Sequence, residues 1–171
     1  RDIYVQLQNI RSEVNDGIGQ QVEDINNLLN AIAELNGRIV SVKAGGRDSS
    51  SFASQRAQLV QKLSAITDIQ SFEDGQGALT IMIAGKTVVD KETVFELGAQ
   101  ASPADGNFYR ISWNGNSSTS MDITELIRGG SLKALIDLRD NQLPDFMGSV
   151  DDLAQSMIAQ VNGIHAQGYA A

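Results

Sequence analysis

Residues 22–39, VEDINNLLNAIAELNGRI, decide the fold of this 171-residue chain. Their apolar side chains recur at steps of three and four residues, the spacing that places them on one face of an α-helix. The same rhythm runs from Ile3 to Val42, with one additional step of four residues after Val14. The pattern therefore predicts one long amphipathic helix over this whole stretch.

Two glycines, Gly17 and Gly19, coincide with the additional step. Each costs a helix about 1 kcal/mol relative to alanine, so we expect a kink or a break there. Asn and Gln flank the apolar stripe where a free coiled coil would carry dense charge, which favours packing within a bundle or an assembly. A plain amphipathic helix in a globular domain is the alternative interpretation.

Residues 43–51, KAGGRDSSS, end this helix. Gly45 and Gly46 suit a helix C-terminus, and Asp48 or a serine after it can cap the next helix. A short loop of this kind between two amphipathic helices favours an antiparallel helical hairpin. The second helix carries four apolar residues on one face: Phe52, Leu59, Leu63 and Ile66.

From Asp68 the apolar period changes to two residues, which indicates β-strands. The strand-like runs are DIQSFE (68–73), ALTIMIA (78–84), KTVVD (86–90), VFELGA (94–99) and FYRISW (108–113). The turn sequences are DGQG (74–77), AGK (84–86), PADGN (103–107) and NGNSS (114–118). We therefore predict a small antiparallel meander of about four or five strands, with a helix against one face.

The segment 127–146, IRGGSLKALIDLRDNQLPDF, returns to a helical pattern. Gly129 and Gly130 let the backbone turn, and we expect Ser131 to cap the following helix. Pro144 has no N–H, so the helix should kink or restart there. An apolar stripe continues towards the end of the chain: Leu132, Leu135, Leu143, Phe146, Val150, Leu153, Met157, Val161 and Ile164.

Together these patterns predict an α+β fold, an elongated bundle of long antiparallel helices with a small antiparallel β-meander inserted between them. The expected units are a long helix plus helical hairpin (1–67), the meander (68–128), and a long C-terminal helix that packs back on the N-terminal helices (129–171). The side chains expected to carry helix packing or assembly are Ile25, Leu29, Ile32, Leu35, Ile39, Leu59, Leu63, Leu135, Leu153, Met157 and Val161.

Composition argues against several classes of function. The formal charge is −8 and no basic stripe occurs, so we expect no nucleic-acid partner. No apolar run reaches the roughly 18–20 residues that a membrane-spanning helix needs, so we expect no membrane partner. The chain has no cysteine, which excludes disulfides, thiolate–zinc sites and cysteine nucleophiles. Because it begins within a helical pattern and without a signal peptide, we expect an excised fragment of a longer protein.

His165, the only histidine, lies near the end of the last helical pattern. The nearest acidic residues on that helix lie roughly 20 Å upstream, too far for a local catalytic triad. We expect His165 to cap the helix or to contact another helix. Asp137, Arg139 and Asp140 invite an acid–base interpretation, but their positions favour side-chain pairs with a neighbouring helix or exposed charges. A hydrolase that uses Asp137, Asp140 or His165 is the remaining enzymatic alternative.

Two further motifs have competing interpretations. GQG (75–77) resembles part of a phosphate-binding loop, but no helix follows it, so we interpret it as a hairpin turn. Trp113 with Tyr109 and Phe108 could line a sugar-binding face, although core packing of a small sheet is the favoured interpretation. No pattern assembles a nucleophile, a base and an oxyanion donor, so we expect a protein that is not an enzyme and has no catalytic, cofactor-binding or metal-binding residues.

Several segments resemble the flagellar hook-associated protein 1 family, and the likeness covers nearly the whole chain. The long helix contributes VEDINNLLNAIAELNGRI (22–39), and the second helix contributes QRAQLVQKLSAITDIQ (55–70). The hairpin GQGALTIMIAGKTVV (75–89) resembles a glycine-centred hairpin of the family. The most specific likenesses are GGSLKALIDLRDNQLPDF (129–146) and the closing LA, VN, His and Gly positions of residues 153–168, because several residues recur at fixed spacing.

The resemblance implies an extracellular structural adaptor that connects the flagellar hook to the filament by forming a ring of copies. It implies three kinds of partner: other copies of the protein, the hook protein with a second junction protein, and an export chaperone that binds a missing terminal segment. It also implies secretion by flagellar type III export without a cleaved signal peptide, and no cofactor. The chain would be a central fragment that lacks the terminal segments. The alternative is a secreted adhesin or binding module that uses the β-meander and Trp113 as its recognition face.

Overall fold

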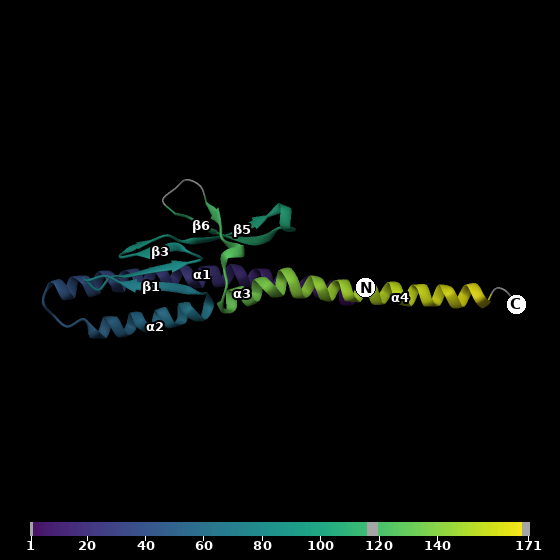
Figure 1. The fold of residues 1–171 in the computed structure, drawn as a ribbon, viewed down its shortest axis with the longest axis horizontal. Helices are drawn as coiled ribbons and strands as arrows, with labels where there is room; N and C mark the ends of the chain where they lie inside the picture. The colour runs from purple at the N-terminus through teal and green to yellow at the C-terminus, as the bar shows by residue number, and fades with distance from the viewer. Residues whose placement is uncertain (1, 116–119, 169–171) are drawn as a thin grey trace.

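The computed structural model describes residues 2–115 and 120–168. Helix α1, Asp2–Ala44, is continuous for 43 residues, or about 64 Å (Figure 1). The break expected at Gly17 and Gly19 is wrong, because α1 runs through both residues without interruption. A methyl group on Gly17 would lie 3.6 Å from Cδ1 of Leu135, and one on Gly19 would lie 3.2 Å from Cε2 of Tyr109. The first distance is an ordinary contact and the second is tight, so a small residue is needed at Gly19, where Tyr109 approaches α1.

Helix α2, Ser50–Ile66, packs antiparallel to α1, which confirms the predicted hairpin (Figure 1). The loop between the helices begins at Gly45 and Gly46, as expected, and Gly46 has a φ of 67°. Ser49 occupies the N-cap position of α2 without a side-chain hydrogen bond. Asp48 takes over the capping role, since its carboxylate accepts hydrogen bonds from the N–H and the hydroxyl of Ser50.

The strands form two antiparallel sheets, so the prediction of a single meander is wrong. The first sheet contains β1 (Ile69–Glu73), β2 (Leu79–Ile83), β3 (Lys86–Asp90) and β4 (Thr93–Val94). The second contains β5 (Leu97–Ser102), β6 (Phe108–Trp113) and β7 (Met121–Asp122). The predicted hairpin turns at 74–77, 84–86 and 103–107 are confirmed. The predicted turn at 114–118 falls partly on residues 116–119, outside the described residues.

The split between the sheets falls inside the predicted strand VFELGA (94–99), and its cause is a side chain of α1. Phe95 N–H still bonds to the Val88 carbonyl of the first sheet. Leu97 instead bonds to Asn26, which accepts from the Leu97 N–H at 2.9 Å and donates to the Leu97 carbonyl at 2.8 Å. Asn26 of α1 thereby pairs with the N–H and the carbonyl of Leu97, which would otherwise be free to continue the first sheet.

The C-terminal part contains a 3₁₀ turn (Thr124–Leu126), α3 (Gly130–Asp137), a π-helical turn (Leu138–Gln142) and α4 (Leu143–Gly168). The prediction that Ser131 caps α3 is wrong. Gly129 occupies the N-cap, and the Ser131 hydroxyl accepts a hydrogen bond from Gln21 of α1. Gly130 has a φ of 82° and lies against the Ile66 carbonyl, so a larger residue has no room there. The helix does not restart at Pro144, because the chain stays helical from Gly130 to Gly168; the change from a π-helical turn to α4 falls just before that residue.

One apolar core joins α1, α2, α3 and both sheets, with the strands lying along one side of α1 (Figure 1). Its fully buried members are Ile18, Ile25, Leu29, Ile32, Leu63, Ile81, Ile83, Val88, Val89, Ile111, Ile123, Ile127 and Leu132. The α+β fold class is confirmed. This core crosses both predicted boundaries, 67/68 and 128/129. The division into units there stays a prediction.

Candidate assembly surface

Most of the predicted packing residues meet one another inside the chain. The buried members are Ile25, Leu29, Ile32, Leu35, Ile39 and Leu63. Leu59 of α2 and Leu135 of α3 are partly buried and pack against the main core, which includes Ile25, Leu29, Ile32 and Leu63. Their faces are therefore already covered by other elements of the same chain.

The remaining three predicted packing residues lie on α4 and are exposed. Leu153, Met157 and Val161 have 62%, 60% and 50% of their surface exposed. With Ile164, at 70%, they recur every three or four residues and define one side of the helix, which we call the α4 apolar face. Figure 1 explains the exposure, because α4 continues past the N-terminus of α1 and has no neighbouring element there.

Only the first part of α4 packs back on α1. Leu143 and Met147 form a small cluster with Leu7. A groove of about 430 Å³ follows, and both helices line it. Its lining residues are Ile3, Tyr4, Val5, Val150, Asp151 and Ala154. The expectation that the whole C-terminal helix packs back is corrected: the contact with α1 ends near residue 154, and the α4 apolar face extends beyond it.

Three asparagines of α1 bond the sheets to the helix. Asn15 accepts from the Tyr109 N–H, Asn26 bonds both backbone groups of Leu97, and Asn36 bonds both backbone groups of Leu79. The asparagines are 11 and 10 residues apart, close to three helical turns, so they lie on one side of α1. Sequence reasoning missed this role, although the spacing was available as a signal.

Two of these asparagines also bond buried arginines. Arg56 of α2, 5% exposed, donates to the Asn36 side chain and the Gly77 carbonyl, each at 2.7 Å, and to Glu73 at 2.6 Å. Arg139 in the π-helical turn, 1% exposed, donates to the Asn15 side chain at 2.9 Å. Each arginine thus ties its own element to α1.

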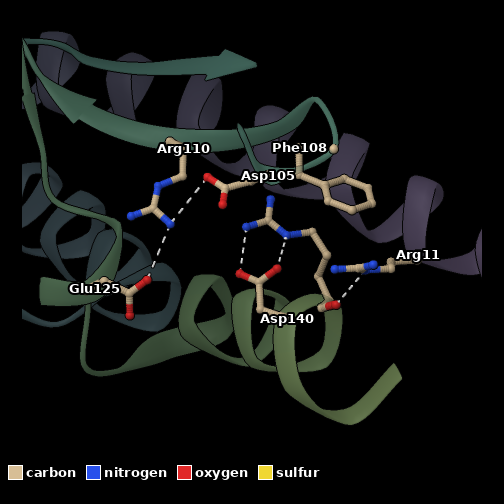
Figure 2. A pocket seen from close by; sticks show the side chains of 8 residues that line it. Arg11, Asp105, Phe108, Arg110, Glu125 and Asp140 are labelled. Carbon is tan, nitrogen blue, oxygen red and sulfur yellow. Dashed lines mark hydrogen bonds and ion pairs between the residues drawn. The ribbon is translucent and has the colours of Figure 1, made fainter. Parts of the chain in front are cut away.

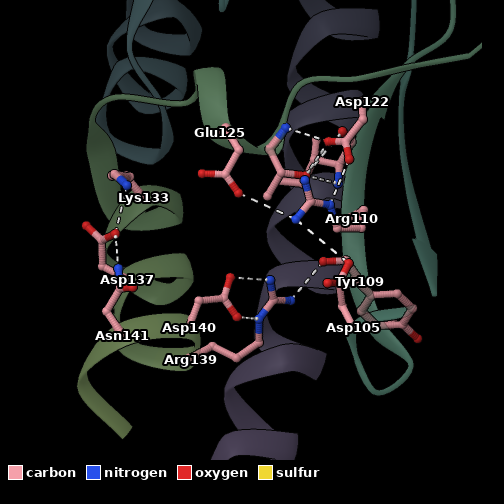
Figure 3. A network of polar contacts seen from close by, with 12 residues as sticks. Asp105, Tyr109, Arg110, Asp122, Glu125, Lys133, Asp137, Arg139, Asp140 and Asn141 are labelled. Carbon is pink, nitrogen blue, oxygen red and sulfur yellow. Dashed lines mark hydrogen bonds and ion pairs between the residues drawn. The ribbon is translucent and has the colours of Figure 1, made fainter. Parts of the chain in front are cut away.

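Arg139 has two further partners, as Figure 3 shows. Its guanidinium donates to the Tyr109 carbonyl of β6 and to both carboxylate oxygens of Asp140, all at 2.8 Å. The expectation of pairs with a neighbouring helix holds for Arg139 through Asn15, whereas the expectation of an exposed charge is wrong for it. Asp137 pairs within its own helix, with Lys133 at 2.7 Å and Asn141 at 3.2 Å.

A cavity of about 400 Å³ lies beside this network, between α1, β6 and the π-helical turn (Figure 2). Its carboxylates face arginines: Asp140 faces Arg139, while Asp105 and Glu125 lie 3.8 and 3.4 Å from Arg110. Each carboxylate that lines the cavity therefore has an arginine as its ion-pair partner.

Asp122, on β7, is the closest partner of Arg110, at 2.7 Å. Burial alone would raise the pKa of Asp122, but hydrogen bonds from Thr124 and Arg110 lower it below the usual value. The hydrogen bond to Asp122 raises the pKa of Arg110. Both groups are therefore charged at neutral pH and serve as an ion pair.

The other candidate catalytic residues do not come together with this cavity. His165 is exposed near the end of α4, beyond the contact with α1. Within residues 2–115 and 120–168, no three His, Cys, Asp or Glu side chains are placed to hold a metal ion. No helix in these ranges has the length and apolarity to cross a bilayer. GQG (75–77) closes the β1–β2 hairpin, where the Gly77 N–H bonds to the Asp74 carbonyl.

The three aromatic residues of β6 have separate structural roles. Trp113 Nε1 donates to the Thr87 carbonyl at 2.8 Å, so its ring links the two sheets. Tyr109 packs against Gly19 of α1, and Phe108 lies under the guanidinium of Arg11. They do not form a shared face for a sugar, which leaves the adhesin alternative without support.

Comparisons with known proteins agree on one family. A protein-family model, described as the flagellar hook-associated protein FlgK helical domain, matches residues 1–171. The chain is similar to flagellar hook-associated protein 1 of Salmonella typhimurium, with 31% identity over 161 residues, and of Escherichia coli, with 29% identity. In both cases the match covers 92% of this chain and 29% of the relative.

A more distant relative and a solved structure extend this result. Flagellar hook-associated protein 1 of Bacillus subtilis is 24% identical over 186 residues, covering 95% of this chain and 36% of that protein. The structure of the flagellar hook junction protein FlgK from Burkholderia pseudomallei superposes with a TM-score of 0.71 at 23% identity, over 81% of this chain and 25% of the other. The structural likeness shows the fold, and the chain spans about a third or less of the length of these proteins.

Proposed function

Since the chain belongs to the family of flagellar hook-associated protein FlgK helical domains, we propose that it is a structural part of the bacterial flagellum, in a protein that joins the hook to the filament. The proposal includes the absence of an enzymatic activity. Two observations support that part: the relatives carry the name flagellar hook-associated protein 1, and the carboxylates that line the cavity have arginine partners.

The α4 apolar face is the observation that carries the proposal. Four large apolar side chains on one side of a helix, each at least half exposed, gain free energy when another surface covers them. The rest of the chain is well suited to hold that helix in place, because buried and partly buried side-chain hydrogen bonds join α1 to α2, to both sheets and to the π-helical turn.

We further propose the partners and the location. Other copies of the protein would form a ring, and the hook protein and a second junction protein would lie on either side of it. The protein would be extracellular, exported unfolded by the flagellar type III route without a cleaved signal peptide, with an export chaperone bound to a segment outside residues 1–171. The absence of cysteine supports this route, since an unfolded chain in transit then cannot cross-link.

The test is a pair of substitutions in the gene that encodes this chain, made in its source bacterium. Met157→Asp places a charge in the α4 apolar face, whereas Gln155→Asp places the same charge on the other side of the same helix. We expect Met157→Asp cells to release filament protein into the medium and to lack filaments, while Gln155→Asp cells swim. Normal filaments on Met157→Asp cells would contradict the proposal.

A further inference from the structure

The π-helical turn Leu138–Gln142 separates α3 from α4 and sets the rotation of α4 about its axis. In this turn the Leu143 N–H bonds to the Leu138 carbonyl, five residues back. A π-helical turn takes up one residue more than an α-helical turn. The helix after it is therefore rotated by about 100° relative to an uninterrupted α-helix. That rotation decides which side of α4 faces α1.

Pro144 follows this turn directly and cannot donate a backbone hydrogen bond to any of its carbonyls. With the same five-residue spacing, the Arg139 carbonyl would accept from residue 144, but proline has no N–H. Arg139 is buried, so an unpaired carbonyl there would be costly. The carbonyl accepts instead from Nε of Arg11, at 2.9 Å, across from α1 (Figure 2).

Arg11 is held in position for this bond from its other side. Its guanidinium lies over the Phe108 ring, 4.4 Å from the centroid, and the Arg139 guanidinium lies 5.5 Å from the same centroid. Arg11 thus contacts β6 through the ring and the π-helical turn through the carbonyl. A residue of α1 thereby replaces a backbone donor that the sequence of the turn itself cannot supply.

We propose that Pro144 and Arg11 form a joint that fixes the direction and the rotation of α4 on α1. Pro144 frees the Arg139 carbonyl, Arg11 engages it, and α4 then presents Leu143 and Met147 to Leu7. Both act as positioning residues. The joint is independent of the proposed function, since it concerns contacts within this chain and holds whether or not α4 assembles with a partner.

A double-mutant cycle tests the joint, because Pro144→Ala restores an N–H that can pair with the freed carbonyl. In the chain that keeps Pro144, Arg11→Ala should lower the folding equilibrium constant about tenfold, measured by urea unfolding. In the Pro144→Ala background the same substitution should lower the folding equilibrium constant at most about threefold, because only the Phe108 contact is then lost. Equal effects of Arg11→Ala in both backgrounds would overturn the proposal.

Arg38→Ala is the matched control, because Arg38 is an exposed arginine of α1 that pairs with Glu34. Its effect should be small and the same in both backgrounds.

Spin labels then report on the direction of α4, since the chain has no cysteine and Glu13→Cys with Gln155→Cys gives two unique sites. Arg11→Ala should broaden the distance distribution between the labels, and adding Pro144→Ala should narrow it again. A distribution unchanged by Arg11→Ala would contradict the role of the joint in directing α4.

Discussion

The middle of α1 and the outer half of α4 carry the same apolar rhythm with opposite results. Between Ile18 and Ile39 every apolar residue of the stripe is buried beneath the sheets, α2 and α3. Between Leu153 and Ile164 every apolar residue of the stripe is at least half exposed. Periodicity therefore identifies an apolar face, whereas the arrangement of the other elements decides whether the same chain covers it.

The two regions also differ in their polar contacts. The middle of α1 bonds the sheets through Asn26 and Asn36, and Asn36 also bonds the buried Arg56. Among the residues that the structure describes, no side chain from Leu153 to Ala166 makes a hydrogen bond or an ion pair with the rest of the chain. The first region is therefore fixed inside the molecule, and the second is available to a partner.

The largest effect on stability should come from the covered stripe. Leu29→Ala removes a fully buried side chain and leaves a cavity in the core, so it should lower the free energy of unfolding by about 2–5 kcal/mol. Urea unfolding followed by circular dichroism measures the change. A loss below 1 kcal/mol, on the order of a surface substitution, would show that the core of α1 is not packed as described.

A smaller loss should follow from Asn36→Ala. The substitution removes one of the three partners of the buried Arg56 and the side chain that bonds both backbone groups of Leu79, which should cost about 1–3 kcal/mol. Asn27→Ala is the matched control, because Asn27 is an exposed asparagine of the same helix. If both variants were equally stable, the asparagines would not be what holds the sheets on α1.

Acid should weaken the ion pair between Asp122 and Arg110. The pKa of Asp122 is lowered in the folded state, so its stabilisation is complete above the unfolded value of about 3.9 and is lost as pH falls through the folded value. Asp122→Asn should reduce the dependence of stability on pH below about pH 5. Asp16→Asn changes the same charge away from Arg110, and an identical pH profile for the two variants would contradict this assignment.

The smallest effect should come from the exposed stripe. Val161→Ala removes apolar surface that is already half in contact with water, so the free energy of unfolding should change by no more than about 0.5 kcal/mol. The measurement is the same urea unfolding experiment. A loss comparable to that of Leu29→Ala would mean that α4 folds back on the chain in solution and that the two stripes do not differ.

The sequence was sufficient for the α+β class, the helical hairpin and the three hairpin turns, because periodicity and turn residues are local signals. It was not sufficient for the two sheets, since the split depends on Asn26 meeting Leu97 across 71 positions of the chain. The burial of Arg139 was missed for a similar reason. Its partners lie on α1 and β6, and LRDNQLP alone resembles an exposed helical segment.

Chemical labelling of Met157→Cys shows whether assembly covers the α4 apolar face, because the chain has no other cysteine. We expect rapid reaction with a maleimide in the isolated chain, and strong protection of the same site in purified flagella that carry the variant protein. Equal reactivity in both states would contradict the claim that the α4 apolar face is covered by assembly.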